Sequence, residues 1–224
     1  MKKLIIHHVA GNPDQMLRDG GHLERVLHEV ARSGLYRVVG IIGSAGPSGI
    51  PLFPEASAIS DAEREGCVFF VCDDTYFLNQ RRLGAYMDIK RRGWPVTALH
   101  SASASIAEGV KLRENVFVDH AVRVLPGANI GANVWVMQDS ELGAGSKIGS
   151  SCWIGRHCRI SERAVLGKNC VLGDGVRIGP NVVLPDWSVI NRSTDITESP
   201  PTTIFVDPLF RSPVYLFDKT RRSI

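Results

Sequence analysis

The sequence predicts an α/β amino-terminal subdomain, a small parallel βαβ unit, followed by an all-β left-handed parallel β-helix of five 18-residue coils. Three observations predict it. An aliphatic residue recurs every six positions over ninety residues, a small or β-branched residue stands four positions after each aliphatic, and strand and helix patterns alternate in the first hundred residues. The expected division is 1–100 for the αβ part, 101–195 for the β-helix and 196–224 for a carboxyl-terminal tail.

The six-residue repeat is the stronger signal, because neither a helical period of 3.6 nor a strand period of 2 produces it. Each hexad supplies one short strand and one corner, three hexads close a triangular coil, and stacked coils bury one another's apolar side chains. Successive coils are expected about 4.8 Å apart. The aliphatic positions are Ile106, Leu112, Val118, Val124, Ile130, Val136, Leu142, Ile148, Ile154, Ile160, Leu166, Leu172, Ile178, Leu184 and Ile190.

The five cysteines indicate packing rather than chemistry. Cys152, Cys158 and Cys170 all occupy the small inward position of their hexads, which accounts for them structurally. With Cys67 and Cys72 the count is odd and lacks CxxC spacing, which argues against a disulfide framework and a zinc site. We therefore expect reduced thiols in a cytoplasmic protein.

Charge and hydropathy exclude other classes. Lys and Arg number 26 against 23 Asp and Glu, so the net charge of +3 does not suggest a nucleic-acid or membrane-surface protein. The apolar run Leu4–Ile6 is too short for a signal peptide, and no run approaches a membrane span.

In the amino-terminal part, strands are expected at 2–6, 38–42, 68–71 and 95–99, and helices at 22–33 and 77–92. Ligands in such units sit beyond the carboxyl ends of the strands. Gly20 and Gly21 precede His22 at the start of the first helix, whose free amides could receive a phosphate, although a glycine pair before a helix is more often just a turn.

Three segments and the hexads together resemble a known family. The segments are Gly20-Gly21-His22, the strand Val68–Val71 followed by Cys72-Asp73-Asp74, and the junction Leu99-His100-Ser101-Ala102. The plan is similar to that of the bacterial hexapeptide-repeat sugar O- and N-acyltransferases, of the sialic acid O-acetyltransferase and nucleotide-4-amino-sugar N-acetyltransferase type.

The resemblance implies a site for each substrate. A nucleotide-linked sugar would bind the amino-terminal unit, which the family folds in a Rossmann-like way, and acetyl-CoA or another acyl-CoA would bind along the β-helix of a homotrimer. It implies no permanently bound cofactor and no metal. The substrate residues it indicates are Gly20, Gly21, His22, Asp73 and Asp74 for the sugar nucleotide, and Trp153, His157 and Gly173 for acyl-CoA.

The family's catalytic histidine is missing here. In the family a histidine acts as general base, and the matching position in Leu142-Gly143-Ala144-Gly145 is Ala144. Trp153 stands where a second histidine is usual, and His157 where a glycine amide faces the thioester oxygen.

Two residues could replace the missing base. Glu162 follows Ala144 by 18 residues, so it stacks on the same face one coil along, and His157 is the nearest imidazole in the sequence. His120 has the matching place in its hexad but on another face of the prism. For each of the three, an ordinary solvent-facing coil residue is the alternative.

Two functions remain open. The first is acyl transfer from acyl-CoA to an amino or hydroxyl group of a nucleotide-linked sugar, in the synthesis of a bacterial surface glycan such as lipopolysaccharide. The second is a non-catalytic trimeric relative that binds a sugar nucleotide or a protein partner. A β-helical carbonic anhydrase is excluded, because its zinc needs three histidines and the coils contain only His120 and His157.

Overall fold

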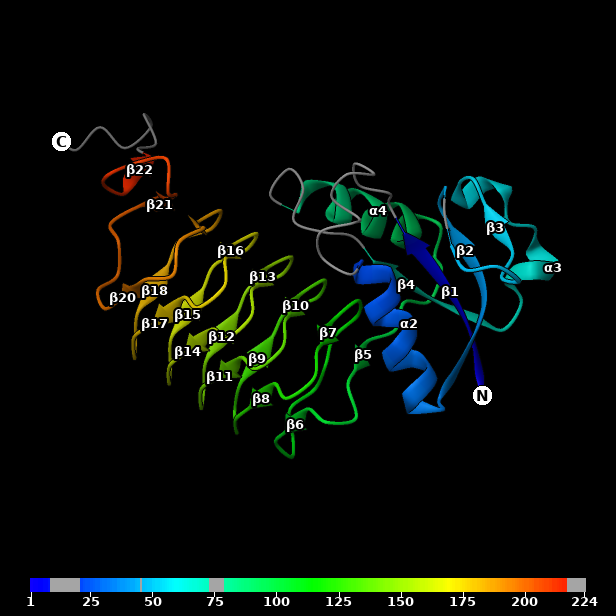
Figure 1. Cartoon of the computed structure of the whole chain (residues 1–224), viewed down its shortest axis with the longest axis horizontal. Coiled ribbons are helices and arrows are strands. Elements are labelled where there is room, and N and C mark those ends of the chain that lie inside the picture. Colours follow the sequence, from blue (N-terminus) through cyan, green and yellow to red (C-terminus); the bar gives the residue numbers. More distant parts are fainter. Residues whose placement is uncertain (9–20, 45, 73–78, 217–224) are drawn as a thin grey trace. The chain divides into compact units, whose positions relative to one another are not determined.

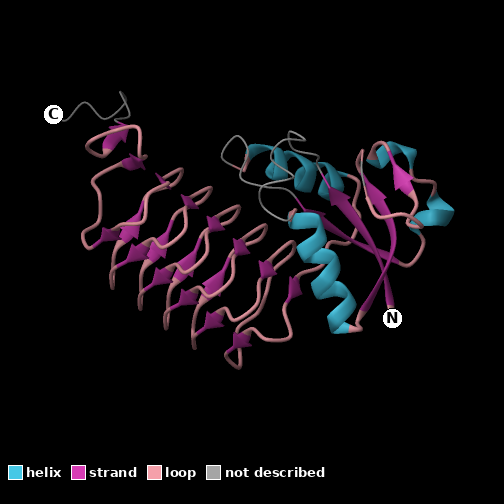
Figure 2. Cartoon of the chain, viewed as in Figure 1, coloured by secondary structure: helices cyan, strands magenta, loops and turns pink. Residues whose placement is uncertain are grey.

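The computed structural model describes residues 1–8, 21–44, 46–72 and 79–216. The chain divides into two compact units. The amino-terminal unit comprises Met1–Ala102 and Arg113–Phe117, and the second unit comprises Ser103–Leu112 and Val118–Ile224. Figures 1 and 2 show helices and a small sheet in the first unit and stacked short strands in the second.

The amino-terminal unit is built on a parallel sheet with the strand order β3-β2-β1-β4. The apolar runs of its central strands explain this place: Leu4, Ile5 and Ile6 are all at most 1% exposed, as expected for a parallel strand covered on both faces. The strands are β1 (Lys2–His8), β2 (Tyr36–Ile42), β3 (Leu52–Phe53) and β4 (Cys67–Cys72).

The first described helix, α2, spans His22–Ser33, which confirms the predicted range. It ends at Gly34, whose φ of 62° lies in the left-handed region that glycine adopts without a steric cost. The other helices of the described residues are η1 (Ala56–Ala58), α3 (Asp61–Arg64) and α4 (Gln80–Arg91). The expected start of α4 at 77 lies outside the described residues.

The prediction of one continuous strand over residues 95–99 is wrong. The Phe69 amide donates to the Pro95 carbonyl (2.8 Å), and the Thr97 amide donates to Phe69 (2.9 Å), which leaves a single bridge, Phe69 to Val96. Proline has no amide to extend such a ladder. The chain forms its next strand, β5, only at Leu99–His100.

The second unit is the left-handed parallel β-helix that the repeat predicts. Its strands stack in parallel on three faces, and each hexad contributes two residues of strand. Face 1 contains β7 (Phe117–Val118), β10 (Trp135–Val136), β13 (Trp153–Ile154), β16 (Val171–Leu172), β19 (Val189–Ile190), β21 (Thr203–Val206) and the antiparallel β22 (Val214–Leu216).

The other two faces are built in the same way. Face 2 contains β6 (Ser105–Ile106), β8 (Arg123–Val124), β11 (Glu141–Leu142), β14 (Arg159–Ile160), β17 (Arg177–Ile178) and β20 (Asp195–Ile196). Face 3 contains β9 (Asn129–Ile130), β12 (Lys147–Ile148), β15 (Val165–Leu166) and β18 (Val183–Leu184).

The predicted aliphatic residue is the second residue of the two-residue strands, and from Val118 to Ile190 it is at most 3% exposed. Leu112 departs from the pattern, since it lies in no strand and is half-buried. The residues after it belong to the other unit: the Asn115 side chain accepts from the Val71 amide (2.7 Å) and donates to the Val71 carbonyl (3.1 Å). The period resumes and runs on to Ile196 in β20.

The corners follow a second rule. The residue three positions after the aliphatic takes a positive φ in almost every hexad, which explains why Asn and Gly recur there. Residues other than Asn and Gly also take a positive φ at this position, among them Asp139 (φ 58°), His157 (φ 55°) and Arg163 (φ 55°). The residue after this corner position is the small or β-branched one of the hexad, and it points inward. The thiols of Cys152 and Cys158 at this position donate to carbonyls of the next coil at 3.0 and 3.1 Å.

Candidate functional site

A groove of about 350 Å³ runs along face 2 and the corner that follows it. Its floor is made by Gly143 and Ala144 of one coil and by Ser161 and Glu162 of the next. The groove therefore contains both the position that the resemblance assigns to the catalytic base and Glu162, one of the two residues that could replace it.

The stacking of coils sets this pair in register. The amide of Arg163 donates to the carbonyl of Ala144 (2.9 Å), and the amide of Gly143 donates to Ile160 (2.7 Å). A Cβ added to Gly143 would stand 2.6 Å from the backbone nitrogen of Glu162, so this close approach requires glycine. Because Gly143 and Ala144 have almost no side chains, the groove is open beside the start of the Glu162 side chain.

Glu162 is an accessible carboxylate. Its side chain is 59% exposed, and Oε1 lies 3.2 Å from Nη2 of Arg163, whose Nε donates to Oδ1 of Asn181 (3.0 Å). An exposed ion pair of this kind is weak, because water screens it and both side chains are flexible. The carboxylate is therefore free to exchange this partner for a proton donor in the groove.

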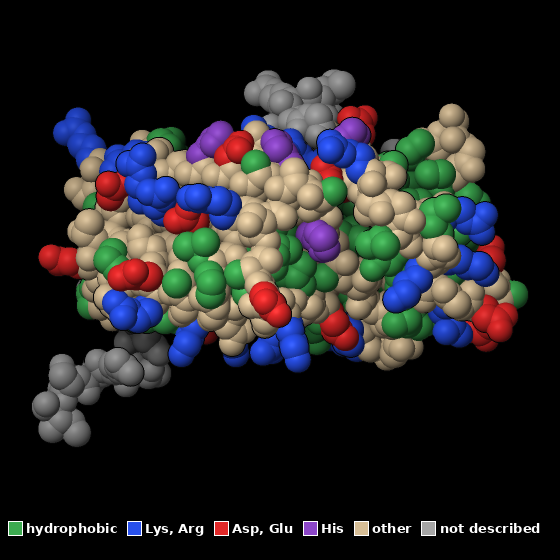
Figure 3. Space-filling view, turned by 90° about the horizontal axis from the view of Figure 1, so that it is seen from below, with side chains coloured by type: hydrophobic (Ala, Val, Ile, Leu, Met, Phe, Trp, Pro, Cys, Tyr) green, Lys and Arg blue, Asp and Glu red, His purple; other side chains and the backbone are tan. Residues whose placement is uncertain are grey.

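The wall of the groove is charged. Glu141 lies between two arginines of face 2, paired with Arg123 on one side and 3.7 Å from Nε of Arg159 on the other. Arg159 is also in register with Arg177 of the next coil. Seen from below, the coils show basic and acidic side chains side by side, with apolar ones between them (Figure 3). An anionic group in the groove would thus meet Arg159 at its edge.

His157 lies elsewhere. It occupies the corner between faces 1 and 2, its side chain is 63% exposed, and Nδ1 is 3.8 Å from Oδ2 of Asp139. It does not line the groove that contains Glu162, which belongs to the corner between faces 2 and 3. The two candidate bases are therefore at opposite edges of face 2. His120 lies at the same corner two coils away, after β7, and its Nδ1 is 3.7 Å from Oδ1 of Asp119.

The remaining predicted acyl-CoA residues lie away from the groove. Trp153 is on face 1, is 8% exposed and stacks on Trp135 with 5.6 Å between ring centroids. Gly173 lies at the same corner as His157, one coil on from Gly155. Its amide donates to the Ile190 carbonyl (2.7 Å). The structure brings Gly173 and His157 to one corner and places Trp153 on the adjoining face.

Two of the predicted sugar-nucleotide residues lie at the start of α2: Gly21 is the N-cap residue, and His22 is the first residue of the helix. The carbonyl of Gly21 accepts the first helical bond from Arg25 (3.2 Å). Gly20, Asp73 and Asp74 lie outside the described residues.

Two further findings bear on function. Within the ranges that the structure describes, no three His, Cys, Asp or Glu side chains gather as metal ligands would. Among the helices of the same ranges, none combines the length and the apolar character needed to span a membrane.

Solved structures share this fold. A variant of perosamine N-acetyltransferase from Caulobacter crescentus, in complex with CoA and GDP-perosamine, is 18% identical, with a TM-score of 0.76 over 89% of this chain and 91% of that one. The acetyltransferase domain of PglB from Neisseria gonorrhoeae is 16% identical, with a TM-score of 0.74 over 93% and 98% of the two chains. The same domain in complex with acetyl coenzyme A is 15% identical, with a TM-score of 0.75 over 91% and 96%.

Sequence comparison adds one match. The family model of the GMPPB C-terminal domain matches residues 96–203, the part of the chain that contains the coils. No curated protein is similar to this sequence at a significant level. The chain therefore has the complete two-unit fold of these acetyltransferases, at an identity that establishes the fold alone.

Proposed function

We propose that this protein transfers an acyl group, in the first place acetyl, from acyl-CoA to an amino or hydroxyl group of a nucleotide-linked sugar. The observation that carries the proposal is the groove on face 2, where an accessible carboxylate, Glu162, stands one coil from Ala144. The shared fold supports it, since the two acetyltransferases align over nearly their whole length. The perosamine N-acetyltransferase is in complex with CoA and GDP-perosamine, and the PglB domain with acetyl coenzyme A.

In the proposed reaction Glu162 is the general base. The nitrogen or oxygen of the sugar attacks the carbonyl carbon of the thioester, the new C–N or C–O bond forms, and the C–S bond breaks. The proton of the nucleophile passes to the Glu162 carboxylate, and the leaving CoA thiolate takes up that one proton, which restores the carboxylate. Arg159, at the edge of the same groove, would attract an anionic part of either substrate.

The proposal extends to the rest of the site and to the assembly. Gly20, Gly21, His22, Asp73 and Asp74 would hold the sugar nucleotide, and Trp153, His157 and Gly173 the acyl-CoA. The active form would be a homotrimer in the cytoplasm that serves the synthesis of a bacterial surface glycan such as lipopolysaccharide. Sedimentation equilibrium would test the trimer, and a monomer at working concentration would contradict it.

The decisive experiment combines binding and turnover. The protein is titrated with CoA by calorimetry and then incubated with acetyl-CoA and a panel of GDP-, UDP- and dTDP-linked 4-amino sugars, while released CoA thiol is followed. We expect Glu162→Gln to lower kcat by about 100-fold or more with a similar KM for acetyl-CoA. Glu108→Gln, which alters an exposed coil glutamate outside the groove, is the matched control.

Other results assign the site differently. Loss of turnover in His157→Gln but not in Glu162→Gln would make His157 the base, with His120→Gln as its control. Unchanged rates in both would exclude both residues. Absence of CoA binding would favour the second candidate function, a non-catalytic relative that binds a sugar nucleotide or a partner. The specific observation in favour of that candidate is Ala144, which has no group that can accept a proton.

A further inference from the structure

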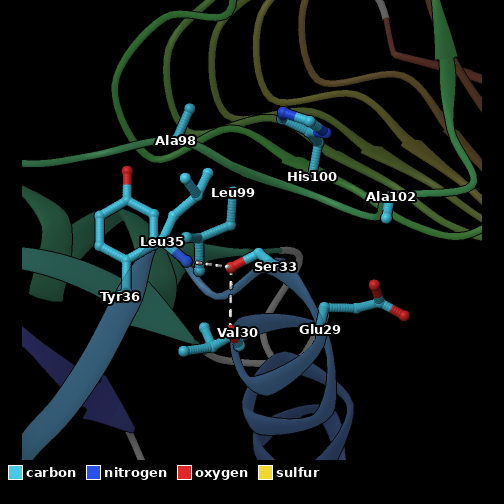
Figure 4. A pocket seen from close by; sticks show the side chains of 9 residues that line it. All are labelled: Glu29, Val30, Ser33, Leu35, Tyr36, Ala98, Leu99, His100 and Ala102. Carbon is cyan, nitrogen blue, oxygen red and sulfur yellow. Dashed lines mark hydrogen bonds between the residues drawn. The ribbon is translucent and has the colours of Figure 1, made fainter. Parts of the chain in front are cut away.

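A second hollow, of about 180 Å³, lies within the amino-terminal unit. The end of α2, the start of β2 and the segment 98–102 enclose it. Figure 4 shows Leu99 pointing down from that segment toward Leu35, with the ring of Tyr36 at one end and the carboxylate of Glu29 below Ala102 at the other. Most of the lining is thus apolar, and one acidic side chain closes one end.

This hollow is distinct from the site expected for the sugar nucleotide. Its lining includes Tyr36, the first residue of β2, and so it lies at the amino edge of the parallel sheet. The expected phosphate and sugar contacts follow the opposite edge, where β1 ends at His8 and β4 ends at Cys72. It is also separate from the groove on face 2, which belongs to the other unit.

Glu29 is the unusual member of the lining. The residue is 6% exposed, and its Oε2 is buried without a hydrogen-bond partner among the described residues. The nearby Ser33 hydroxyl is already engaged, because it donates to the Val30 carbonyl (2.9 Å) and accepts from the Leu35 amide (3.2 Å). A carboxylate oxygen removed from water is costly unless a donor, and best a cation, pairs with it.

We propose that this pocket binds a small primary ammonium compound with an apolar chain. The ammonium group would donate hydrogen bonds to Glu29, and the chain would lie against Val30, Leu35 and Leu99. An ammonium group fits better than a hydroxyl group, because it supplies three donors and carries a charge opposite to that of a carboxylate. A cavity of about 150 Å³ accommodates a ligand the size of benzene, so a chain of about four to six carbons matches the space.

Three four-carbon probes of different charge test the charge requirement on the full-length protein at pH 7: n-butylammonium, 1-butanol and butyrate. Binding is followed by calorimetry and by chemical-shift changes of the Val30, Leu35 and Leu99 amides. We expect saturable binding of n-butylammonium, binding of 1-butanol weaker by about 10- to 100-fold, and none of butyrate. Equal binding of the first two probes, or no saturable binding of n-butylammonium at millimolar concentration, would overturn the proposal.

Two variants of α2 locate the site. Glu29→Gln retains the shape and removes the charge, so it should weaken n-butylammonium by about 10-fold or more. Glu24→Gln changes an exposed glutamate of the same helix and should leave binding unchanged. Because Glu29→Gln replaces a carboxyl group whose Oε2 is buried without a partner among the described residues, it should also unfold at the same or a higher temperature than the unaltered protein.

The remaining outcomes count against the proposal. A Glu29→Gln variant that unfolds several degrees lower would show that the carboxylate serves the fold rather than a ligand. If the unaltered protein does not bind n-butylammonium and Glu29→Gln changes its oligomeric state, Glu29 pairs instead with a second copy of the chain. The proposal does not depend on acyl transfer, so neither result bears on the groove of face 2.

Discussion

His7 should make the stability of this protein depend on pH in a window set by its burial. The residue lies at the carboxyl end of β1, between β2 and β4. Burial lowers the pKa of its imidazole from 6.5 to about 4; Asp88 opposes this shift, and His8 and Arg92 add to it. The folded state therefore resists protonation over a range of pH in which the unfolded chain accepts the proton.

The sign and size follow from linkage. Between pH 6.5 and about 4 the unfolded chain binds more protons, so the free energy of unfolding falls as the pH falls. One pKa unit corresponds to about 1.4 kcal/mol, so the full loss is on the order of 3 kcal/mol and is complete near pH 4. Above pH 7 the imidazole is neutral in both states and contributes no pH dependence.

Urea unfolding of His7→Gln, followed by tryptophan fluorescence from pH 4 to 8, measures this contribution. The difference between the unaltered protein and the variant cancels the carboxylates that titrate in both. We expect that difference to be constant above pH 7 and to shift by about 3 kcal/mol toward pH 4, in favour of the variant. Parallel curves for His7→Gln and the unaltered protein would refute the reasoning.

Three further predictions concern Gly143, His157 and Cys158 of the coils, the first with a contrasting variant in α4. Gly143→Ala should lower the free energy of unfolding by about 1–3 kcal/mol, because its Cβ would meet the Glu162 backbone nitrogen at 2.6 Å. Gly84→Ala in α4, where an added Cβ would meet no atom within 4 Å beyond its chain neighbours and its own helix backbone, should instead raise it by about 0.5–1 kcal/mol, and urea titration of both variants checks the contrast. His157→Gly should raise the melting temperature, because it relieves a left-handed backbone that costs about 1–2 kcal/mol; a lower temperature would contradict this. Burial raises the pKa of the Cys158 thiol to about 12, so a thiol reagent should modify it only in denaturant, and rapid labelling of the native protein would contradict its inward position.

The 18-residue coil made part of the candidate site predictable. Ala144 and Glu162 stand one coil apart in the sequence, and the structure brings both into one groove. The spacing does not show which corners share a hollow, so it could not reveal that His157 lies at the other edge of face 2. Arg159 was missed for a similar reason: its strand position was clear, but its place in the wall depends on the Glu141 side chain beside it.

The corner rule was also missed, although its signal is present. Asn115, Asn133, Asn169 and Asn181 all stand three positions after an aliphatic residue, and asparagine is the residue other than glycine that best tolerates a positive φ. That regularity would have identified His157 as a corner residue under backbone strain rather than as an ordinary coil position.

By itself the sequence determined the β-helix, because each hexad encodes its own strand and corner and the next coil repeats the same local rule. It likewise determined α2, whose apolar spacing and Gly34 are local signals. Only the tertiary structure decided where the repeat is interrupted at Leu112, since the residues after it bond to β4 through Asn115. It alone placed Glu29 beside the segment 98–102, because that contact joins residues about seventy positions apart, and no periodic rule encodes a single long-range contact.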